Sequence, residues 1–465
     1  MTVLTCFKSY DIRGRVGEDL DADMAYRIGR AFAHVMTPQK VVLGRDIRDS
    51  SPMLQAAIAR GLADEGVEVL DLGLCGTEEV YFATDHLGAG GGMMITASHN
   101  PIGDNGVKII GPEARPISQA TGLGAMHDLV AAFDFGPAVT VPGKIRSVHV
   151  RDAYVDRVLS FIDPAALRPL NILVNAGNGA AGPTFDAIAA ALSDKGAKQA
   201  FTCLHHDPDA SFPNGIPNPL LPENRPVTGN AVKAARADLG VAWDGDFDRC
   251  FLFDENGDFI DGEYIVGLLA AAMLVQSPGS KIVHDPRIMW NTQRIVGAAG
   301  GKAVLSRTGH ALMKEKMREV DAVYGGEISA HHYFRDFMYC DSGMIPWLLV
   351  LDYMSRSDQP LSALVAEMRA MHPSSGEINF RLGDPASAVA AVEAQFTEGA
   401  DIDRRDGLSA AYPDWRFSLR LSNTEPVVRL NVETRGDADA LRRLTDQICQ
   451  VLAGFAGDGT TAGQA

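Results

Sequence analysis

KVVLGRDIRDSSPMLQAAIARGLADEGVEVLDLG, residues 40–73, contains the pattern that decides the fold class. A short β-branched run opens it, and Leu54, Ile58 and Leu62 then recur at helical spacing. Gly66 stops this helix, and the chain returns as a second strand, VEVLDLG. An apolar strand, a helix and another apolar strand are typical of a βαβ unit in a parallel sheet that is covered on both faces. The stretch therefore predicts an α/β domain.

The same pattern recurs twice further along the chain. NILVNAGNGAAGPTFDAIAAAL begins at Asn171 and KIVHDPRIMWNTQRIVGAAGGKAVLS begins at Lys281. From about Ser374 the order becomes EINFRL, AVAAVEAQF, WRFSLRLS, VVRLNVE and a last helix, which suits antiparallel pairing in a small α+β domain. We expect three α/β units and a smaller α+β C-terminal domain. The pattern alone leaves open whether the three units are true repeats, because any α/β chain repeats strands and helices.

The length of the chain predicts several domains, since 465 residues exceed what one core supports. Proline and glycine punctuate FGPAVTVPGKIRSVHV near residues 135–150, which we interpret as a linker. The hairpin-type turn DENGD lies near a second boundary. We expect four domains, over residues 1–150, 151–255, 256–372 and 373–465.

Composition limits the partners. The 46% hydrophobic and 22% charged residues are ordinary globular values, and the formal net charge of −17 disfavours nucleic acid and anionic lipid as partners. An anionic substrate would need a local cluster of basic residues. Because no apolar run approaches the length of a membrane-spanning helix and MTVLTCFKSYDIRGR lacks the layout of a signal peptide, we expect a cytoplasmic protein with no membrane partner. The six scattered cysteines favour neither a disulfide framework nor a zinc site, and we expect them to be reduced and mostly buried.

One glycine motif resembles a dinucleotide-binding turn. Gly177, Gly179 and Gly182 match G-x-G-x-x-G between a predicted strand and a predicted helix. The acidic residue that this fingerprint needs about 20 positions further on is absent, because Asp207 lies too far along the chain. A tight turn that lets helix and strand pack closely is the favoured interpretation, and a nicotinamide-dependent dehydrogenase is the alternative.

WDGDFDRCFLFDENGD carries the strongest local signal. Asp244, Asp246 and Asp248 alternate and can gather around one hard cation, with Arg249 beside them to hold a phosphate. The pattern lacks the glycine and distal glutamate of an EF-hand. An acidic surface turn is the alternative, but apolar runs on both sides place the carboxylates where burial without a partner would be costly. The stretch therefore predicts a metal site.

ITASHNP, residues 95–101, places Ser98 at the end of an apolar strand. By itself this serine is most simply a turn residue that caps the strand. A serine that is phosphorylated beside Mg²⁺ can instead donate a phosphoryl group, because the metal offsets the charge of the transferring group. The metal motif and ITASHNP together favour this second interpretation.

Four separated motifs, TASHNP, DGDFDR, GGEISAHHYF (325–334) and RLSNTEPVVRLNVE (420–433), resemble the α-D-phosphohexomutase superfamily, and the full-length pattern is most similar to its bacterial phosphomannomutases. The resemblance runs from about Cys6 to the last helix. It implies three related α/β domains and a smaller fourth domain around a central cleft. It also implies an isomerase in which phosphorylated Ser98 and a hexose 1,6-bisphosphate interconvert mannose 6-phosphate and mannose 1-phosphate for GDP-mannose synthesis, as a monomer or homodimer. Phosphoglucomutase, or a dual specificity, is the alternative within the family.

The resemblance also implies roles for individual residues. Mg²⁺ would be held by Asp244, Asp246, Asp248 and a phosphate oxygen on Ser98, and hexose 1,6-bisphosphate would be the activator. The positions matching catalytic residues are Ser98, His99, Lys108, Arg13 and Arg249. The positions matching substrate-binding residues are Tyr10, Arg287, Gly309, His310, Glu327, Ser329, His331, Arg420, Ser422, Asn423 and Thr424. Arg287 stands where some relatives have lysine, whose hydrogen-bond geometry differs.

Several alternatives stay open on sequence alone. Tyr10 can be a core aromatic, Lys108 a solvated lysine, and Arg429 either a phosphate ligand or a structural residue. A phosphatase that uses Asp244 as its nucleophile is another alternative, but it would not explain the TASHNP and SNTEP motifs. A sugar-phosphate binding protein without catalytic activity would need neither Ser98 nor all three aspartates.

Overall fold

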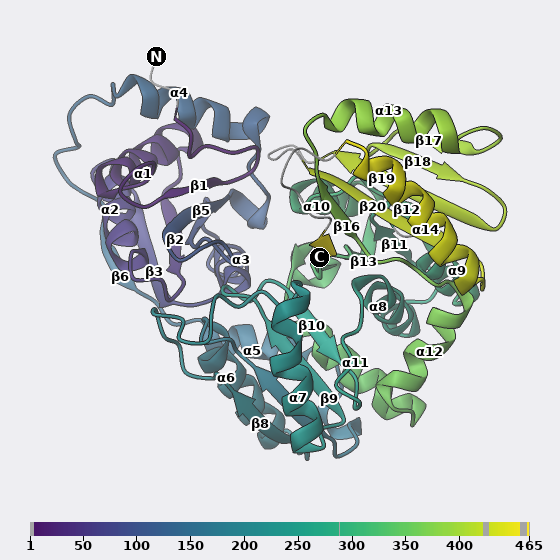
Figure 1. Cartoon of the computed structure of the whole chain (residues 1–465). Coiled ribbons are helices and arrows are strands. Elements are labelled where there is room, and N and C mark those ends of the chain that lie inside the picture. Colours follow the sequence, from purple (N-terminus) through teal and green to yellow (C-terminus); the bar gives the residue numbers. More distant parts are fainter. Residues whose placement is uncertain (1–3, 288, 422–426, 456–462, 465) are drawn as a thin grey trace.

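Four units of secondary structure follow one another along the chain (Figure 1). The structure is a computed structural model that describes residues 4–287, 289–421, 427–455 and 463–464. The first three units combine mixed sheets with helices, and the fourth has an antiparallel sheet. In Figure 1 the first and fourth units form the two upper sides of the molecule, with the second and third units below and between them. The predicted fold class is confirmed.

The first unit is built on a six-stranded mixed sheet in the order β1-β5-β4-β2-β3-β6. β5 pairs antiparallel with β4 and β1, whereas the other neighbours are parallel. Its strands are β1 (Ile12–Arg15), β2 (Lys40–Arg45), β3 (Glu68–Leu74), β4 (Gly92–Ile95), β5 (Asp104–Ile110) and β6 (Ile145–Ser147). Its helices are α1 (Ala22–Met36), α2 (Ser51–Ala63), α3 (Thr77–His86) and α4 (Gly124–Ala132).

The stretch that predicted the fold class forms β2, α2 and β3. Leu54, Ile58 and Leu62 are fully buried on the inner face of α2, as their helical spacing predicts. The linker expected near residues 135–150 is only partly one, because β6 lies within it and pairs in parallel with β3. All three residues of β6 are exposed, so the segment carries no apolar alternation that a sequence pattern could detect.

The second unit has a four-stranded sheet in the order β10-β9-β7-β8. β7 pairs in parallel with β8 and β9, and β10 is antiparallel to β9. Its strands are β7 (Asn171–Asn175), β8 (Ala200–Leu204), β9 (Leu239–Trp243) and β10 (Cys250–Phe253). Its helices are α5 (Arg151–Leu159), α6 (Ala181–Asp194) and α7 (Arg225–Ala235).

The third unit has a five-stranded sheet in the order β12-β11-β13-β14-β15. β11 pairs in parallel with β12 and β13, and the remaining pairs are antiparallel. Its strands are β11 (Lys281–His284), β12 (Lys302–Leu305), β13 (Ala322–Gly326), β14 (His332–Phe334) and β15 (Cys340–Asp341). Its helices are α8 (Gly262–Gln276), α9 (Trp290–Ala298), α10 (His310–Val320), α11 (Met344–Ser357) and α12 (Leu361–Met371).

The C-terminal unit has an antiparallel sheet in the order β17-β18-β19-β20-β16-β21. Its strands are β16 (Ile378–Arg381), β17 (Asp401–Asp403), β18 (Leu408–Ala411), β19 (Trp415–Leu421), β20 (Val427–Thr434) and β21 (Gly463–Gln464). Its helices are α13 (Pro385–Phe396) and α14 (Ala438–Ala453). This unit has its own apolar cluster, which includes Phe417, Leu430 and Ile448.

The three α/β units share one topology. Each contains three parallel strands followed by an antiparallel strand, in the orders β5-β4-β2-β3, β10-β9-β7-β8 and β14-β13-β11-β12. The loop from the outer parallel strand to the antiparallel strand spans residues 96–103, 244–249 and 327–331, respectively. These three loops carry Ser98, the three aspartates and the motif around Glu327. Repetition of one fold thus places three chemically different loops at equivalent positions.

The core continues from one unit to the next. One apolar cluster joins residues of the first three units, and the indole N–H of Trp243 donates to the carbonyl of Gly343 at 2.9 Å. α8 is buried on most of its surface, which explains its nearly continuous apolar sequence. None of the six cysteines forms a disulfide, and four of them are buried. Within the described residues, no helix has the length and apolar character needed to cross a membrane.

Candidate active site

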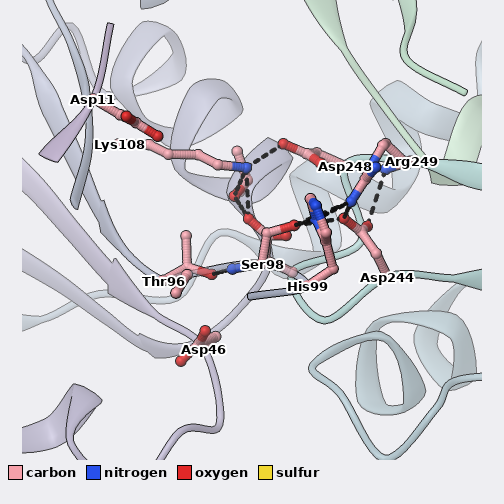
Figure 2. A network of polar contacts seen from close by, with 12 residues as sticks. Asp11, Asp46, Thr96, Ser98, His99, Lys108, Asp244, Asp248 and Arg249 are labelled. Carbon is pink, nitrogen blue, oxygen red and sulfur yellow. Dashed lines mark hydrogen bonds and ion pairs between the residues drawn. The ribbon is translucent and has the colours of Figure 1, made fainter. Parts of the chain in front are cut away.

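Ser98 lies in the loop between β4 and β5, with its side chain turned toward the second unit (Figure 2). Its hydroxyl donates to Oδ2 of Asp244 at 2.7 Å and lies 3.0 Å from Nδ1 of His99. The backbone of Ser98 has a φ of 50°, in the left-handed region that non-glycine residues rarely adopt. Ser98 is only 3% exposed. The serine therefore points at the acidic loop instead of capping its own strand.

The three aspartates of the second unit form a compact group of oxygen donors. Asp244, Asp246 and Asp248 are at most 2% exposed, and one ligand atom of each lies within 4.8 Å of the others. One oxygen of Asp246 and one of Asp248 accept no hydrogen bond. Buried carboxylate oxygens without donors fit a hard divalent cation such as Mg²⁺.

A second group of possible ligands shares one of these aspartates. Asp248, His331 and Asp341 have ligand atoms equally close together. However, the ammonium of Lys314 is 2.6 Å from Asp341 and offsets its charge. The all-carboxylate group therefore fits a hard cation better than the group that contains a histidine.

Two cations flank the aspartates. The Lys108 ammonium donates to Oδ2 of Asp246 at 2.7 Å and also to Asp248, while the Arg249 guanidinium donates to Asp244 at 2.7 and 2.9 Å. Burial by itself would lower the pKa of Lys108, but Asp246 and Asp248 outweigh it and raise this pKa. Lys108 thus stays protonated and acts as a hydrogen-bond donor.

The carboxylates respond differently to their surroundings. Burial raises the pKa of Asp244 to about 6, against the opposing charge of Arg249. Burial would also raise the pKa of Asp246, but Lys108 and the hydroxyl of Thr77 outweigh it and lower this pKa. Asp246 is therefore ionised at neutral pH, whereas Asp244 gains a proton in mildly acidic solution.

The histidines of the site are neutral at physiological pH. The charge of Arg249, together with burial, holds the pKa of His99 well below its usual value. Burial does the same for His331 and lowers the pKa of His310 to about 4. Nε2 of His331 lies 3.8 Å from Oδ1 of Asp248, which brings the third unit against the loop of residues 244–249, called the metal loop below.

A cavity of about 690 Å³ opens between the first, third and fourth units. Arg13 donates to the carbonyl of Ala97 and to Asn100, so it joins the cavity to the Ser98 loop. The predicted site residues that line this cavity are Tyr10, Arg13, Gly309, His310 and Arg420. Tyr10 packs edge-on against His310 at 5.9 Å between ring centroids. The cavity thus brings together residues that are far apart in the sequence.

The loop of residues 327–331, called the sugar loop below, carries three of the predicted substrate-binding residues and forms a network of hydrogen bonds. Glu327 is 2% exposed and accepts from the backbone N–H of Gly309 at 2.9 Å and from the hydroxyl of Tyr333 at 2.6 Å. Ser329 lines a second cavity of about 590 Å³, and its hydroxyl lies 3.2 Å from Nδ1 of His331. The alternation of Glu327 and Ser329 therefore does not bring both side chains into one cavity in this structure.

Arg287 joins the sugar loop to the C-terminal unit. Its guanidinium pairs with Asp285 at 2.8 Å and Glu377 at 3.0 Å, and it lies 3.9 Å from Glu327. Burial would lower its pKa, but these carboxylates outweigh it and raise the pKa. Glu377 also lies 3.5 Å from Arg429, which borders both cavities.

The predicted substrate-binding residues 420–424, called the phosphate loop below, are described only as far as residue 421. Arg420, at the end of β19, lines the larger cavity, and its Nε lies 3.5 Å from Asp406. Ser422, Asn423 and Thr424 lie outside the described residues.

The glycine motif at residues 177–182 packs backbone against backbone. A Cβ atom at Gly179 would lie 2.8 Å from the carbonyl oxygen of Gly245, and one at Gly182 would lie 2.1 Å from that of His206. The N–H of Ala180 donates to the carbonyl of Gly245 at 3.1 Å. The glycines thus allow the start of α6 to pack closely against the backbone of residues 206 and 245, as the close-packing interpretation predicts.

Sequence reasoning missed three residues that support the site. Arg48 binds the backbone of the Ser98 loop, Thr77 donates from its hydroxyl to Asp246 at 2.5 Å, and Asp406 accepts from the N–H of Thr308 at 3.2 Å. Thr77 begins α3 and Arg48 precedes α2. The residues around Thr77 and Arg48 indicate only that a helix begins there. Their role in the site could not be predicted, because each contacts a segment that is distant in the sequence.

Comparison with known proteins agrees with this architecture. Four family models match the chain: phosphoglucomutase/phosphomannomutase alpha/beta/alpha domains I (residues 5–125), II (152–257) and III (261–371), and the C-terminal domain (377–451). The chain belongs to the phosphoglucomutase/phosphomannomutase family. Its metal loop falls in domain II and its Ser98 loop in domain I.

Similar proteins extend over nearly the whole chain. The phosphomannomutases of Salmonella montevideo and Escherichia coli K12 are 57% and 55% identical over 454 residues, which cover 97% of this chain and all of each relative. Phosphohexose mutases of Xanthomonas campestris are 54% identical over 452 residues, with the same coverage. A solved phosphoglucomutase/phosphomannomutase family protein from Burkholderia thailandensis superimposes with a TM-score of 0.86 at 33% identity, over 99% of this chain and 100% of that one.

Proposed function

We propose that the protein is a phosphomannomutase that interconverts mannose 6-phosphate and mannose 1-phosphate. The observation that carries the proposal is the placement of the Ser98 hydroxyl 2.7 Å from Asp244, within a buried group of three aspartates. The names of relatives that are 48–57% identical over 97% of the chain support mannose as the sugar. Release of mannose 1-phosphate would supply GDP-mannose synthesis.

In the proposed reaction, phosphorylated Ser98 donates its phosphoryl group to the free hydroxyl of the hexose monophosphate. The bond between Oγ of Ser98 and phosphorus breaks while a bond from phosphorus to the sugar oxygen forms, and the proton lost by the sugar hydroxyl ends on Oγ of Ser98. The resulting hexose 1,6-bisphosphate turns around and returns its other phosphate to Ser98. Added hexose 1,6-bisphosphate would act as the activator by phosphorylating Ser98.

The aspartates fit a resident Mg²⁺, since two of their buried oxygens accept no hydrogen bond. Asp244, Asp246 and Asp248 would hold it together with a phosphate oxygen on Ser98 and stabilise the negative charge of the transferring group. Lys108 remains protonated beside them, so it would orient and polarise the attacking hydroxyl. Arg249 lies 3.4 Å from Oγ of Ser98 and would bind the phosphoryl oxygens.

The remaining residues would bind the substrate. Arg13 would stabilise developing charge, and His99 and His331, whose lowered pKa values keep them neutral, would offer ring nitrogens for hydrogen bonds at the site. We assign sugar and phosphate binding to residues that line the two cavities, to Glu327 beside Gly309, and to the phosphate loop. These residues are Tyr10, Arg287, Gly309, His310, Glu327, Ser329, Arg420, Ser422, Asn423 and Thr424. Monomeric or homodimeric assembly and a cytoplasmic location stay predictions.

The proposal is tested by phosphorus NMR of the purified protein with Mg²⁺ and a trace of hexose 1,6-bisphosphate. Mannose 1-phosphate and glucose 1-phosphate are supplied separately, and Ser98→Ala serves as the control. Faster conversion of mannose 1-phosphate to its 6-phosphate is expected. Faster conversion of glucose 1-phosphate would favour phosphoglucomutase, the other activity in the family name. Inorganic phosphate as the product would favour a phosphatase, and no turnover of either sugar would contradict the proposal.

A further inference from the structure

Arg48 binds the backbone of the Ser98 loop through several hydrogen bonds. Its guanidinium donates to four carbonyl oxygens, those of Ser98 (2.9 Å), Asn100 (2.7 Å), Pro101 (2.8 Å) and Asp104 (3.0 Å). All four acceptors belong to the segment that runs from Ser98 to the start of β5. Arg48 is only 2% exposed. A buried cation at the point where four carbonyl dipoles converge compensates their mutual repulsion.

The loop needs such support because of its backbone conformation. Ser98 has a φ of 50°, which is unfavourable for a residue with a Cβ atom and persists only where the surroundings enforce it. The turn that contains it ends in a proline, and no described backbone N–H donates to the carbonyls of Ser98 and Asn100, whereas the N–H of Asp104 donates to that of Pro101 at 3.0 Å. Arg48 supplies the donors for both of the carbonyls that lack a backbone partner.

A second set of contacts fixes the loop at its start. The hydroxyl oxygen of Thr96 accepts from the N–H of Ser98 at 2.8 Å. Asp46 accepts from the N–H of Arg48 at 3.0 Å and from the hydroxyl of Ser51 at 2.6 Å, so hydrogen bonds connect the segment between β2 and α2 that carries Arg48. Figure 2 shows Thr96 and Asp46 on one side of Ser98 and Arg249 on the other.

The backbone of the metal loop lies against the carbonyl group of Ser98, one of the four groups that Arg48 binds. A Cβ atom at Gly245 would lie 2.7 Å from the carbonyl oxygen of Ser98, so the two backbones are in close contact there. This oxygen is thus enclosed by the guanidinium of Arg48 and the backbone of Gly245. Any rotation of the Ser98 peptide would move Oγ away from Asp244.

We propose that Arg48 is a positioning residue that fixes the turn of Ser98 and thereby aims Oγ at the aspartates of the metal loop. Arg48 borders neither of the two cavities, so it acts through the backbone of Ser98 and not on the substrate. The inference deepens the proposed function and rests on phosphoryl transfer at Ser98. It predicts an effect on the rate of transfer and little effect on substrate binding.

The test compares Arg48→Met and Arg48→Lys with wild type and with a matched control, Arg30→Met. Arg30 is also a buried arginine of the first unit, 7% exposed, and donates to the carbonyls of Phe135 and Gly136 at 3.1 Å, away from the site. Three properties are measured: kcat and KM for mannose 1-phosphate, the rate of Ser98 phosphorylation by hexose 1,6-bisphosphate from intact mass, and amide hydrogen exchange by mass spectrometry.

Arg48→Met is expected to lower kcat by about 100-fold, the cost of a misplaced reacting group, with KM changed less than about threefold. Arg48→Lys should restore part of the loss, since an ammonium can still donate to the carbonyls. Exchange should accelerate in residues 96–104 of Arg48→Met, whereas Arg30→Met should keep the kcat of wild type. Full kcat in Arg48→Met, a loss no larger than that in Arg30→Met, or exchange that accelerates evenly over the first unit would overturn the inference.

The exchange measurement separates this inference from the proposed function, because it needs no substrate. If wild type converted no hexose phosphate while Arg48→Met still loosened residues 96–104 selectively, the proposed function would fail and the positioning of the loop would stand. If wild type were active and exchange in residues 96–104 were unchanged in Arg48→Met, the positioning role would fail alone. Should Arg48→Met not fold, the same comparison applies to Arg48→Lys.

Discussion

We predict that the affinity of the protein for Mg²⁺ falls as the pH is lowered through 6, because Asp244 takes up a proton there. Burial raises the pKa of this carboxyl to about 6, against the opposing charge of Arg249, and Asp246 and Asp248 add to the rise. The pKa of Asp246 is lowered, and the charge of Arg249, together with burial, lowers the pKa of His99 and keeps it neutral. Asp244 is therefore expected to dominate proton release in this range.

The size of the effect follows from competition between the proton and the metal. With a pKa of about 6, the apparent dissociation constant for Mg²⁺ should rise about tenfold at pH 5 and by only about a tenth at pH 7. The native pKa of Asp244 also exceeds its unfolded value of about 3.9. Its contribution to stability is thus full below about pH 4 and is lost as the pH rises through 6, at about 1.4 kcal/mol per pKa unit. Because Mg²⁺ should bind more tightly at pH 7 than at pH 5, a given Mg²⁺ concentration should raise the free energy of unfolding more at pH 7.

The assay is a calorimetric titration with Mg²⁺ at pH 5, 6 and 7, in pairs of buffers with different ionisation enthalpies, so that released protons are counted. Ser98→Ala is used as the host protein because it retains the three aspartates and cannot be phosphorylated. We expect nearly one proton released per Mg²⁺ at pH 5, about half of one at pH 6 and about a tenth at pH 7. In this host, Asp244→Asn should remove the proton release.

Proton release that is absent at pH 5, or an Mg²⁺ affinity that is constant from pH 5 to 7, would refute the reasoning. The first result would mean that Asp244 is ionised throughout or is not a ligand. Retained proton release in Asp244→Asn would assign the titration to another group of the site.

Three further predictions address other parts of the molecule. Ser98→Ala should abolish nearly all mutase turnover while keeping the circular dichroism spectrum of wild type, and unchanged activity would contradict phosphoryl transfer at Ser98. Arg420→Ala should raise KM for mannose 1-phosphate about tenfold or more through loss of a charge-assisted hydrogen bond, so initial rates that show only a lower kcat would argue against a phosphate-binding role. Glu263→Gln should raise the unfolding temperature at pH 8.5, because burial and then Asp261 raise the pKa of Glu263 to about 8 and ionisation above this pH destabilises the native state. The increase in unfolding temperature caused by Glu263→Gln should become smaller toward pH 5. An equal increase at pH 8.5 and pH 5 would rule out ionisation of Glu263 as the cause.

Local patterns in the sequence predicted most of the fold. The stretch at residues 40–73 forms β2, α2 and β3. These elements could be predicted because apolar spacing alone distinguishes a buried strand from an amphipathic helix. β6 escaped prediction, since its three exposed residues depend on hydrogen bonds to β3, more than 70 residues earlier. A short edge strand of this kind is specified by its partner and not by its own composition.

The residues of the candidate site also fall into two groups: those that the sequence identifies and those that only the structure reveals. Ser98 and the aspartates could be singled out because their residue types are unusual next to apolar strands. Arg48 and Thr77 could not, because they contact segments 50 and 169 residues away. The distant groups that accept hydrogen bonds from Arg48 are backbone carbonyls, which every sequence offers. Supporting residues of this type become visible only when the packing of the loops is known.

The shared topology of the three α/β units explains why the parts of the site were recognisable separately. In each unit the functional loop follows the carboxyl end of a parallel strand, the edge at which ligands bind in α/β sheets. The loops converge because contacts between units orient them, among them the hydroxyl of Thr77 on Asp246 and the indole of Trp243 on the carbonyl of Gly343. Changes at such contacts should therefore impair the reaction even though they touch neither the substrate nor Ser98, since they alter the distance between loops that are each intact.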